Sequence, residues 1–473
     1  MVSSLPTEID YRILSLLSPE QAHHFQVVPF QMEQTGVSCL AGPETHLQLP
    51  RLELLLGQSL QLEPLSQSDI QAQLARFYPL HQAKASGVSK TELSDSDAVR
   101  FVQKMIEEAA QMGASDIHVE QYEGQARVRF RWEGQLIEKY EIPLGQYNAI
   151  ISRIKILAEL DIAERRLPQD GRIPFSVGDT QIDLRVSTIP GKKGEKAVMR
   201  LLTRSSEHLD LQNLGLPEWE ARHYQRAIQR PNGIVLITGP TGSGKTTTLY
   251  ATLNQLNTPT KNILTIEDPV EYKIQGINQV QLKEGIGLTF DRALRAFLRQ
   301  DPDIIMVGEI RDTPTAQIAI RAALTGHLVF STLHTNSAWD AITRLRDMGT
   351  PAYLLAASLR LVVAQRLVRV LCPQCKSVSQ EIQFPQWQER YQLSQHFHAT
   401  GCPACYFTGY RGRKAVFEVL PISREVASLI KSGAEEVHEF QTREGMPSLS
   451  DNLAQLVASG ETSLAEAMMH VMD

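Results

Sequence analysis

The chain has 473 residues, 42% of them hydrophobic, which is enough to bury the cores of about two to four domains. Its formal net charge of −6 argues against a protein that coats nucleic acid, because such binding needs a concentrated basic surface. The first residues include acids and no basic region before an apolar core, so we expect no signal peptide. The most apolar long segment, 353–367, is interrupted by arginine and glutamine and is expected to form a soluble helix. These features are typical of a cytoplasmic protein.

Residues 1–80 contain short apolar runs, such as 25–30, and an amphipathic segment at 69–77. This pattern predicts a small α/β domain. Because the domain holds no catalytic constellation, we interpret it as a docking module rather than as a second enzyme. The next segment, 81–97, is polar and poor in large apolar residues, which predicts a flexible linker.

Residues 98–214 combine one helical pattern with several strand patterns, which predicts an α+β domain. The helix is expected over 98–112 and is followed by Gly113. Arginines alternate with apolar residues along 127–132, and the pair Glu133-Gly134 predicts a turn after that strand. Alternating arginines of this kind are typical of a solvated strand face.

A glycine-rich turn follows the apolar, β-branched run 233–238 and closes on Lys245 and Thr246. It matches the P-loop pattern G-x-x-x-x-G-K-[ST], and a helix-forming segment follows, which argues against a glycine-rich turn that binds nothing. Glycines let the chain curl so that successive N–H groups point at phosphates, while the lysine adds charge and the threonine hydroxyl can bind Mg²⁺. The expected ATP-binding residues are Gly239, Pro240, Thr241, Gly242, Ser243, Gly244, Lys245, Thr246 and Thr247.

Short apolar strands are expected at 263–266, 304–307 and 328–333, and polar residues follow each of them. In α/β proteins the carboxyl ends of parallel strands meet at one sheet edge, where ligands bind. Glu267 follows the first strand. Glu309 follows the second, and this second strand is typical of a Walker B strand. One carboxylate there can hold Mg²⁺ directly or through water while another orients the attacking water. The magnesium ligands are expected to be Thr246 and Glu309, and the assignment of the water-orienting carboxylate stays open between Glu267 and Glu309.

Two histidines, His327 and His334, bracket the third strand. We expect them at the same sheet edge, with His334 sensing the γ phosphate, although a lone histidine in such a place is more often a structural group.

Four of the five cysteines form two C-x-x-C pairs separated by 26 residues. Paired thiolates at this spacing predict a closed, structural tetrahedral Zn²⁺ site, because a catalytic site would keep an open position. The alternative is two pairs of buried thiols. The fifth cysteine, Cys39, is expected in a core. The expected zinc ligands are Cys372, Cys375, Cys402 and Cys405.

The ordered motifs resemble those of a secretion-superfamily ATPase, the motor of type II secretion systems and type IV pilus assembly. In that family GPTGSGKTTT is Walker A, TIEDPVE the aspartate box, DPDIIMVGEIRD Walker B and TGHLVFSTLHTN the histidine box. Upstream, GASDIHVE, RRLPQDGR and DLRVSTIP resemble its second N-terminal domain, and downstream QRLVRVLCPQC and GCPACYFTGYRGRKAVFEVL resemble its metal-binding segment. Together these motifs cover about 98–420.

The resemblance implies an α/β fold with a RecA-like P-loop ATPase domain at its centre. Its parts would be an N-terminal docking domain (1–80), a linker (81–97), a second α+β, PAS-like domain (98–214), the RecA-like core (215–371), a tetracysteine zinc subdomain (372–415) and a C-terminal helical region (416–473).

The resemblance also implies a ring, usually a hexamer, that docks on an inner-membrane platform through its N-terminal region and pushes pseudopilin or pilin subunits. Functional arginines of the family match Arg185, Arg200, Arg295, Arg299, Arg311 and Arg413. Several of them, including Arg185 and Arg200, would lie near the phosphates and act with Lys245, Glu267 and Glu309.

Three alternatives remain at this point. The zinc segment argues against the pilus-retraction branch, and the short N-terminal region, in which 23–78 resembles the docking domain of type II secretion ATPases, favours secretion over pilus assembly. The absence of an Arg-Leu-Gly motif predicts no cyclic dinucleotide ligand.

A P-loop nucleic-acid motor is disfavoured by the acidic balance and by the lack of a basic, aromatic-laced strip. An ATP-binding scaffold without turnover is disfavoured by the intact P-loop and carboxylates.

Overall fold

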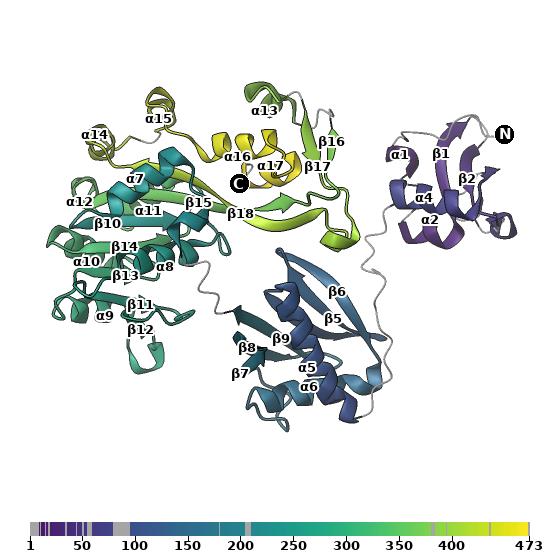
Figure 1. Ribbon diagram of the computed structural model, residues 1–473, viewed down its shortest axis with the longest axis horizontal. Helices are drawn as coiled ribbons and strands as arrows, with labels where there is room; N and C mark the ends of the chain where they lie inside the picture. Colours follow the sequence, from purple (N-terminus) through teal and green to yellow (C-terminus); the bar gives the residue numbers. More distant parts are fainter. Residues whose placement is uncertain are drawn as a thin grey trace. The chain divides into compact units, whose positions relative to one another are not determined.

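The computed structural model describes residues 9, 11–14, 16–17, 19–33, 36–43, 45–49, 52–53, 59–78, 95–178, 180–203, 210–379, 384–393, 395–434 and 437–471. The chain divides into two compact units, one made of residues 1–90 with 137–141 and the other of 91–136 with 142–473. Figure 1 shows the elements of both units.

The first unit is a small α/β domain, as expected. Strands β1 and β2 pair antiparallel and β2 and β3 pair parallel, and the side chain of Cys39 on β2 is fully buried. Burial raises the pKa of Cys39 to about 12, so this thiol is a core residue as predicted. Its elements are α1 (Tyr11–Leu14), α2 (Pro19–Phe25), β1 (Val27–Glu33), β2 (Gly36–Ala41), η1 (Thr45–Gln48), β3 (Leu60–Pro64) and α4 (Gln67–Phe77). Residues 81–94 of the expected linker lie outside the described residues.

The second N-terminal domain is built on a six-stranded sheet with the order β6-β5-β4-β9-β8-β7. Helix α5 begins at Asp95, so it includes the last three residues of the expected linker, and Gly113 with a φ of 73° follows its end. The turn at Glu133-Gly134 is confirmed. The elements are α5 (Asp95–Met112), β4 (Asp116–Tyr122), β5 (Gln125–Trp132), β6 (Gln135–Ile142), α6 (Leu144–Leu157), β7 (Gln169–Val177), β8 (Thr180–Pro190) and β9 (Glu195–Thr203).

The alternating arginines of β5 form a partly exposed face, with side chains 22% to 36% exposed, but they are paired with acids rather than only hydrated. Arg129 donates two hydrogen bonds of 2.9 Å to Glu120, whose side chain is only 2% exposed. Lys196 lies 2.8 Å from the same carboxylate. Burial opposes ionisation, but these cations lower the pKa of Glu120 to about 2. Paired charges, which a single strand's sequence does not reveal, therefore occupy this face.

The core that follows the second N-terminal domain is organised around a seven-stranded sheet with the order β12-β11-β13-β14-β10-β15-β18. All neighbouring pairs are parallel except β15 and β18. Ile234 and Leu236 of β10 pack into one apolar cluster with α9 to α12, whereas Val235 and Ile237 pack into another with α7 and α8. Helices therefore cover both faces, which confirms the predicted α/β class.

The three strands predicted after the P-loop are confirmed as β11, β13 and β14. The core elements are η3 (Leu211–Leu214), α7 (Glu218–Ile228), β10 (Gly233–Thr238), α8 (Lys245–Leu256), β11 (Ile263–Glu267), β12 (Asn278–Gln281), η4 (Glu284–Ile286), α9 (Phe290–Phe297), β13 (Ile304–Val307), α10 (Thr313–Leu324), β14 (Leu328–Leu333), α11 (Ala338–Asp347), α12 (Ala352–Ser358) and β15 (Leu359–Leu371).

The helix predicted for 353–367 is wrong beyond Ser358. Helix α12 ends there, and β15 begins at Leu359 and runs between β10 and β18. A strand buried on both faces is apolar at nearly every position, so its periodicity cannot be distinguished from that of a buried helix.

After the cysteine segment the chain returns to the core sheet, which the sequence did not predict. Strand β18 pairs antiparallel with β15 and crosses the boundary expected at 415/416, so residues 416–421 are strand rather than helix. The last elements are β16 (Ser377–Ser379), α13 (Pro385–Arg390), β17 (His396–His398), η5 (Pro403–Cys405), β18 (Tyr410–Pro421), α14 (Arg424–Ser432), α15 (His438–Arg443), α16 (Leu449–Ala458) and α17 (Leu464–Val471).

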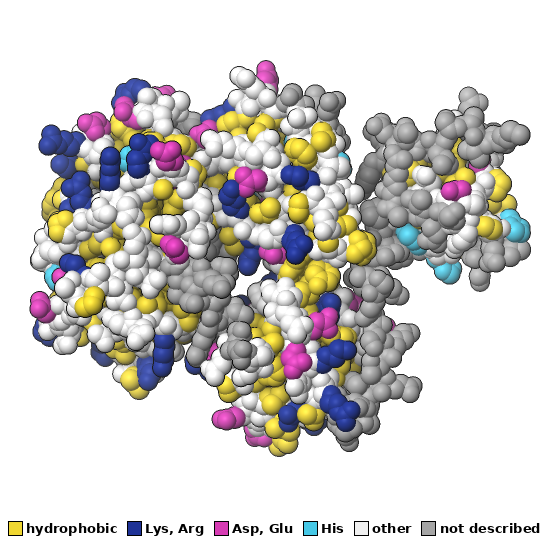
Figure 2. Space-filling model, viewed as in Figure 1, with side chains coloured by type: hydrophobic (Ala, Val, Ile, Leu, Met, Phe, Trp, Pro, Cys, Tyr) yellow, Lys and Arg dark blue, Asp and Glu magenta, His cyan; other side chains and the backbone are white. Residues whose placement is uncertain are grey.

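The described helices include none that is long and apolar enough to cross a membrane. Figure 2 shows acidic and basic side chains together on the visible face of the described residues, so the charge there is mixed.

Candidate functional site

The glycine-rich loop connects the buried strand β10 to helix α8. Gly239, Gly242 and Gly244 have φ values of 146°, 83° and 87°, which L residues with side chains rarely adopt. Ser243 is 3% exposed, and its hydroxyl has no hydrogen-bond partner within the described part of the chain. A buried hydroxyl without a partner fits a loop that binds a polar ligand.

Lys245 begins α8 and points back over the loop. Its Nζ donates to the carbonyl oxygens of Gly239 at 2.8 Å and Pro240 at 3.0 Å. Burial lowers the pKa of Lys245, while the nearby Glu309 carboxylate raises it and Arg366 lowers it. The ammonium thus lies among loop carbonyls, from which it can turn to phosphate oxygens. Thr241 and Thr246 are exposed on the same loop and first helical turn, and Thr247 is half-buried.

Glu309 lies just after β13 and is a partly exposed carboxylate. Arg311 donates to its Oε1 at 2.6 Å, and Nε2 of His334 lies 3.4 Å from its Oε2. Burial opposes ionisation, but Arg311 and His334 hold the pKa of Glu309 below its usual range. The site therefore presents an ionised carboxylate close to Lys245.

Glu267 has a different environment, because it is only 3% exposed at the end of β11. Its oxygens accept hydrogen bonds from Tyr250, from Thr265 at 2.6 Å and from Gln279 at 3.1 Å. Burial raises the pKa of Glu267 above its usual value, although the hydrogen bonds from these donors lower it. The carboxylate thus accepts from protein donors on α8, β11 and β12, and Tyr250 and Gln279 are site residues that the sequence reasoning missed.

The two histidines do not lie at the same sheet edge, so that expectation is wrong. His327 precedes β14 and His334 follows it, and a strand of this length separates them by roughly 20 Å. Nδ1 of His327 lies 2.8 Å from the Ala322 carbonyl oxygen near the end of α10, which is a structural contact. Only His334 reaches Glu309.

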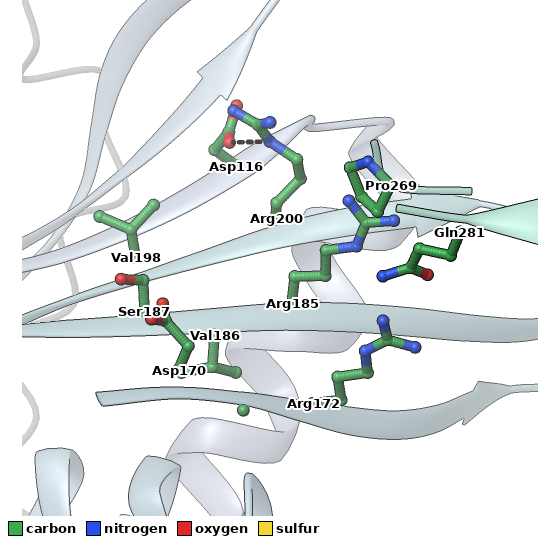
Figure 3. Close-up of a pocket in the computed structure, with 11 residues that line it drawn as sticks. Asp116, Asp170, Arg172, Arg185, Val186, Ser187, Val198, Arg200, Pro269 and Gln281 are labelled. Carbon is green, nitrogen blue, oxygen red and sulfur yellow. Dashed lines mark hydrogen bonds and ion pairs between the residues drawn. The ribbon is translucent and has the colours of Figure 1, made fainter. Parts of the chain in front are cut away.

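Arg185 and Arg200 belong to a row of arginines across the second N-terminal domain, shown in Figure 3. Arg172 lies opposite Arg185, and Arg185 opposite Arg200, on neighbouring strands. Like charges in directly opposite positions destabilise a sheet unless an anion or acid compensates them. Arg200 pairs with Asp116 at 3.0 Å, and Arg185 donates to the Val270 carbonyl oxygen at 3.0 Å.

The same arginines line a pocket of about 550 Å³ that also includes Pro269 and Gln281 of the core. Arg185 also lies 3.2 Å from Glu271, so the row reaches the aspartate-box segment. Arg172 was missed by the sequence reasoning, because its place beside the other two depends on strand register rather than on local pattern.

Of the remaining family arginines, Arg311 lies beside Glu309, and the others lie elsewhere in the chain. Arg311 contacts Glu309 and lies 3.5 Å from Asp268. Arg295 pairs with Asp291 at 3.8 Å on α9, and Arg299 donates to the Arg295 carbonyl oxygen. Arg413 lies 3.1 Å from Glu133.

The four cysteines predicted to bind zinc lie together between β15 and β18, with their Sγ atoms all within 4.8 Å of one another. Three of the Sγ–Sγ distances are 3.9, 3.7 and 3.7 Å. A tetrahedral site with Zn–S bonds of about 2.3 Å requires sulfurs about 3.8 Å apart. The N–H groups of Gly401 and Gly409 point at sulfurs at 3.3 and 3.2 Å. Burial and the adjacent thiols raise the pKa of Cys375 to about 12, so a cation is needed for a full thiolate set. The residues fit a structural zinc ion.

A family model described as "Type II/IV secretion system protein" matches residues 91–469. Type II secretion system ATPase E of Vibrio cholerae is 44% identical over 443 residues, which are 88% of this chain and 88% of that protein. Type IV pilus assembly ATPase PilB of Myxococcus xanthus is 41% identical over 493 aligned residues, covering 98% of this chain and 87% of that protein.

Among solved structures, the pilus retraction motor PilT with bound ADP has a TM-score of 0.55 at 27% identity and covers 78% of this chain and 97% of that chain. The family model spans most of the sequence, and relatives well above 30% identity match nearly its full length. The predicted resemblance is confirmed, and the chain belongs to the type II/IV secretion system protein family.

Proposed function

We propose that the protein is a ring-forming ATPase that hydrolyses ATP with Mg²⁺ and drives pseudopilin assembly and protein export through a type II secretion system. The observation that carries this proposal is the ionised Glu309 carboxylate beside Lys245 at the end of a glycine-rich loop. Together with family membership, this arrangement supports hydrolysis by positioning and charge neutralisation, without a covalent intermediate.

The loop residues Gly239–Thr247 would hold the phosphates, and Lys245 would leave the Gly239 and Pro240 carbonyls to contact the β and γ phosphates. Thr246 and Glu309 are the residues that would hold Mg²⁺, which would neutralise phosphate charge.

Of the two carboxylates, we assign the orientation of the attacking water to Glu309, in addition to its part in holding Mg²⁺. It is partly exposed, and only Arg311 and His334 contact it among the described residues. Glu267 is enclosed by three donors and instead positions the aspartate-box segment against Tyr250. The contact with His334 would let this residue report the state of the carboxylate and of the γ phosphate.

The ring, a hexamer, would dock through residues 1–80 on an inner-membrane platform protein, which would place a cytoplasmic protein at that membrane. The relatives named for pilus assembly support the alternative of a type IV pilus extension motor. The mixed charge in Figure 2 and the net charge of −6 do not favour a nucleic-acid motor.

The purified protein is expected to release phosphate from ATP in the presence of Mg²⁺. This release should stop when EDTA removes the metal. Lys245→Ala should lower the rate by at least about a hundredfold, because the phosphates lose their main cation. A colorimetric phosphate assay measures both effects. Equal rates in Lys245→Ala and the parent would reject the P-loop as the site of hydrolysis.

Gene deletion distinguishes the two biological alternatives. Loss of proteins from the culture supernatant with normal pili supports the secretion role, and loss of pili with normal secretion supports the pilus role. Co-purification of the full chain with inner-membrane proteins would identify the docking partner.

Cys402→Ser is expected to lower bound zinc from about one equivalent to below about 0.2, because a structural site needs all four thiolates. The segment between β15 and β18 should then lose its order, whereas ATP binding at the P-loop should partly survive. Metal analysis of protein purified without chelator measures the zinc. Cys39→Ser removes a buried thiol outside the cluster and should keep the metal. A Cys402→Ser protein with a full equivalent of zinc would contradict this site.

A further inference from the structure

Gln365 of β15 contacts the glycine-rich loop from the side of the sheet, and its side chain is almost fully buried. Its Nε2 donates to the Ser243 carbonyl oxygen at 2.7 Å, and its Oε1 accepts from the Thr248 hydroxyl at 2.8 Å. A backbone carbonyl oxygen can only accept, so the amide group of Gln365 has one possible orientation here. The side chain therefore connects the end of the loop to the first turns of α8.

The hydrogen bond to Ser243 determines how one peptide of the loop is turned. In a trans peptide the C=O and the following N–H point in opposite directions. When Gln365 holds the Ser243 carbonyl toward β15, the N–H of Gly244 must point away from β15. Phosphate binding by such a loop depends on successive N–H groups that share one direction.

The loop is also packed against Gln365 with no space for a side chain. A Cβ on Gly239 would lie 2.3 Å from the Gln365 carbonyl oxygen, and a Cβ on Gly244 would lie 2.8 Å from Nε2. Both glycines thus allow a close approach to β15 in addition to the curl of the loop.

We propose that Gln365 is a positioning residue for phosphate binding, which fixes the Ser243-Gly244 peptide so that the Gly244 N–H faces the nucleotide phosphates. This inference rests on the proposed binding of ATP at the loop. The residue touches no substrate itself and acts through the backbone that it holds.

Gln365→Leu removes both hydrogen bonds at similar volume. We expect binding of ADP to weaken by at least about tenfold, as for a lost hydrogen bond to a charged group, while binding of adenosine stays unchanged. Competition against a fluorescent ADP analogue on the full chain measures both affinities. A merely structural role would weaken both ligands equally or only lower the melting temperature.

Gln365→Glu keeps the size of the side chain and the acceptor for Thr248, so it tests the same idea if the leucine variant does not fold. The ionised form would face the Ser243 carbonyl oxygen and repel it, whereas the protonated form can donate an O–H there. Burial favours the protonated form, so ADP affinity relative to the parent should rise as the pH falls.

Gln441→Leu is the matched control, because Gln441 is also buried and donates to Glu418 at 3.3 Å. It should change the melting temperature without changing the ratio of ADP to adenosine affinity. Unchanged ADP binding in folded Gln365→Leu, or equal losses for both ligands, would overturn the positioning role alone. A parent protein that binds no ADP or ATP would instead reject the proposed function on which this inference rests.

Discussion

Glu309→Gln is expected to bind ATP within about threefold of the parent and to hydrolyse it at least about a hundredfold more slowly. The substitution removes the negative charge with little change of shape, so the loop and Lys245 can still hold the phosphates. The amide lacks the charge that orients and polarises an attacking water. Equilibrium binding and single-turnover phosphate release on the same preparation separate the two effects.

Glu267→Gln is the informative comparison, because this carboxylate is buried and accepts from Tyr250, Thr265 and Gln279. An amide there places an NH₂ group among donors, so we expect a lower melting temperature together with measurable residual hydrolysis. Parent-like rates in Glu309→Gln would remove Glu309 from the mechanism. A larger rate loss in Glu267→Gln, at an unchanged melting temperature, would assign the water to Glu267.

The parts of the site that could be predicted from sequence are those encoded by contiguous residues. The P-loop, the strand ends with Glu267 and Glu309, and the paired cysteines each occupy a few consecutive positions with a fixed pattern. The chemistry of such a segment follows from its residue types and spacing, and the structure places the cysteine sulfurs close enough for one metal ion.

The features that the sequence did not reveal depend on long-range pairing. The apolar segment 353–367 has no period that separates helix from strand, and only its place between β10 and β18 makes it β15. The relation between Arg172 and Arg185 comes from strand register, and Gln365 meets the P-loop because β15 pairs with β10. Burial, which distinguishes Glu267 from Glu309, is likewise a property of the packed chain.

Neighbouring subunits of the proposed ring are expected to share the active site. Hydrolysis in a ring ATPase needs positive charge for the developing charge on the γ phosphate, and Lys245 supplies only part of it. Arg185 is bound to the Val270 carbonyl of its own chain, whereas Arg200 is 64% exposed and pairs only with Asp116 among the described residues. Arg200 is therefore the better candidate to reach the nucleotide of an adjacent copy.

Mixing two inactive proteins tests this geometry. Arg200→Ala and Lys245→Ala should each lose most activity, yet mixed rings should regain part of it at interfaces that pair an intact P-loop with an intact arginine. Phosphate release measured across mixing ratios should then pass through a maximum. Asp116→Asn is a useful control, because it removes the negative charge that pairs with Arg200 and keeps the guanidinium. If native mass spectrometry shows mixed rings but every ratio gives only the sum of the two parents, Arg200 acts within its own subunit or has no part in hydrolysis.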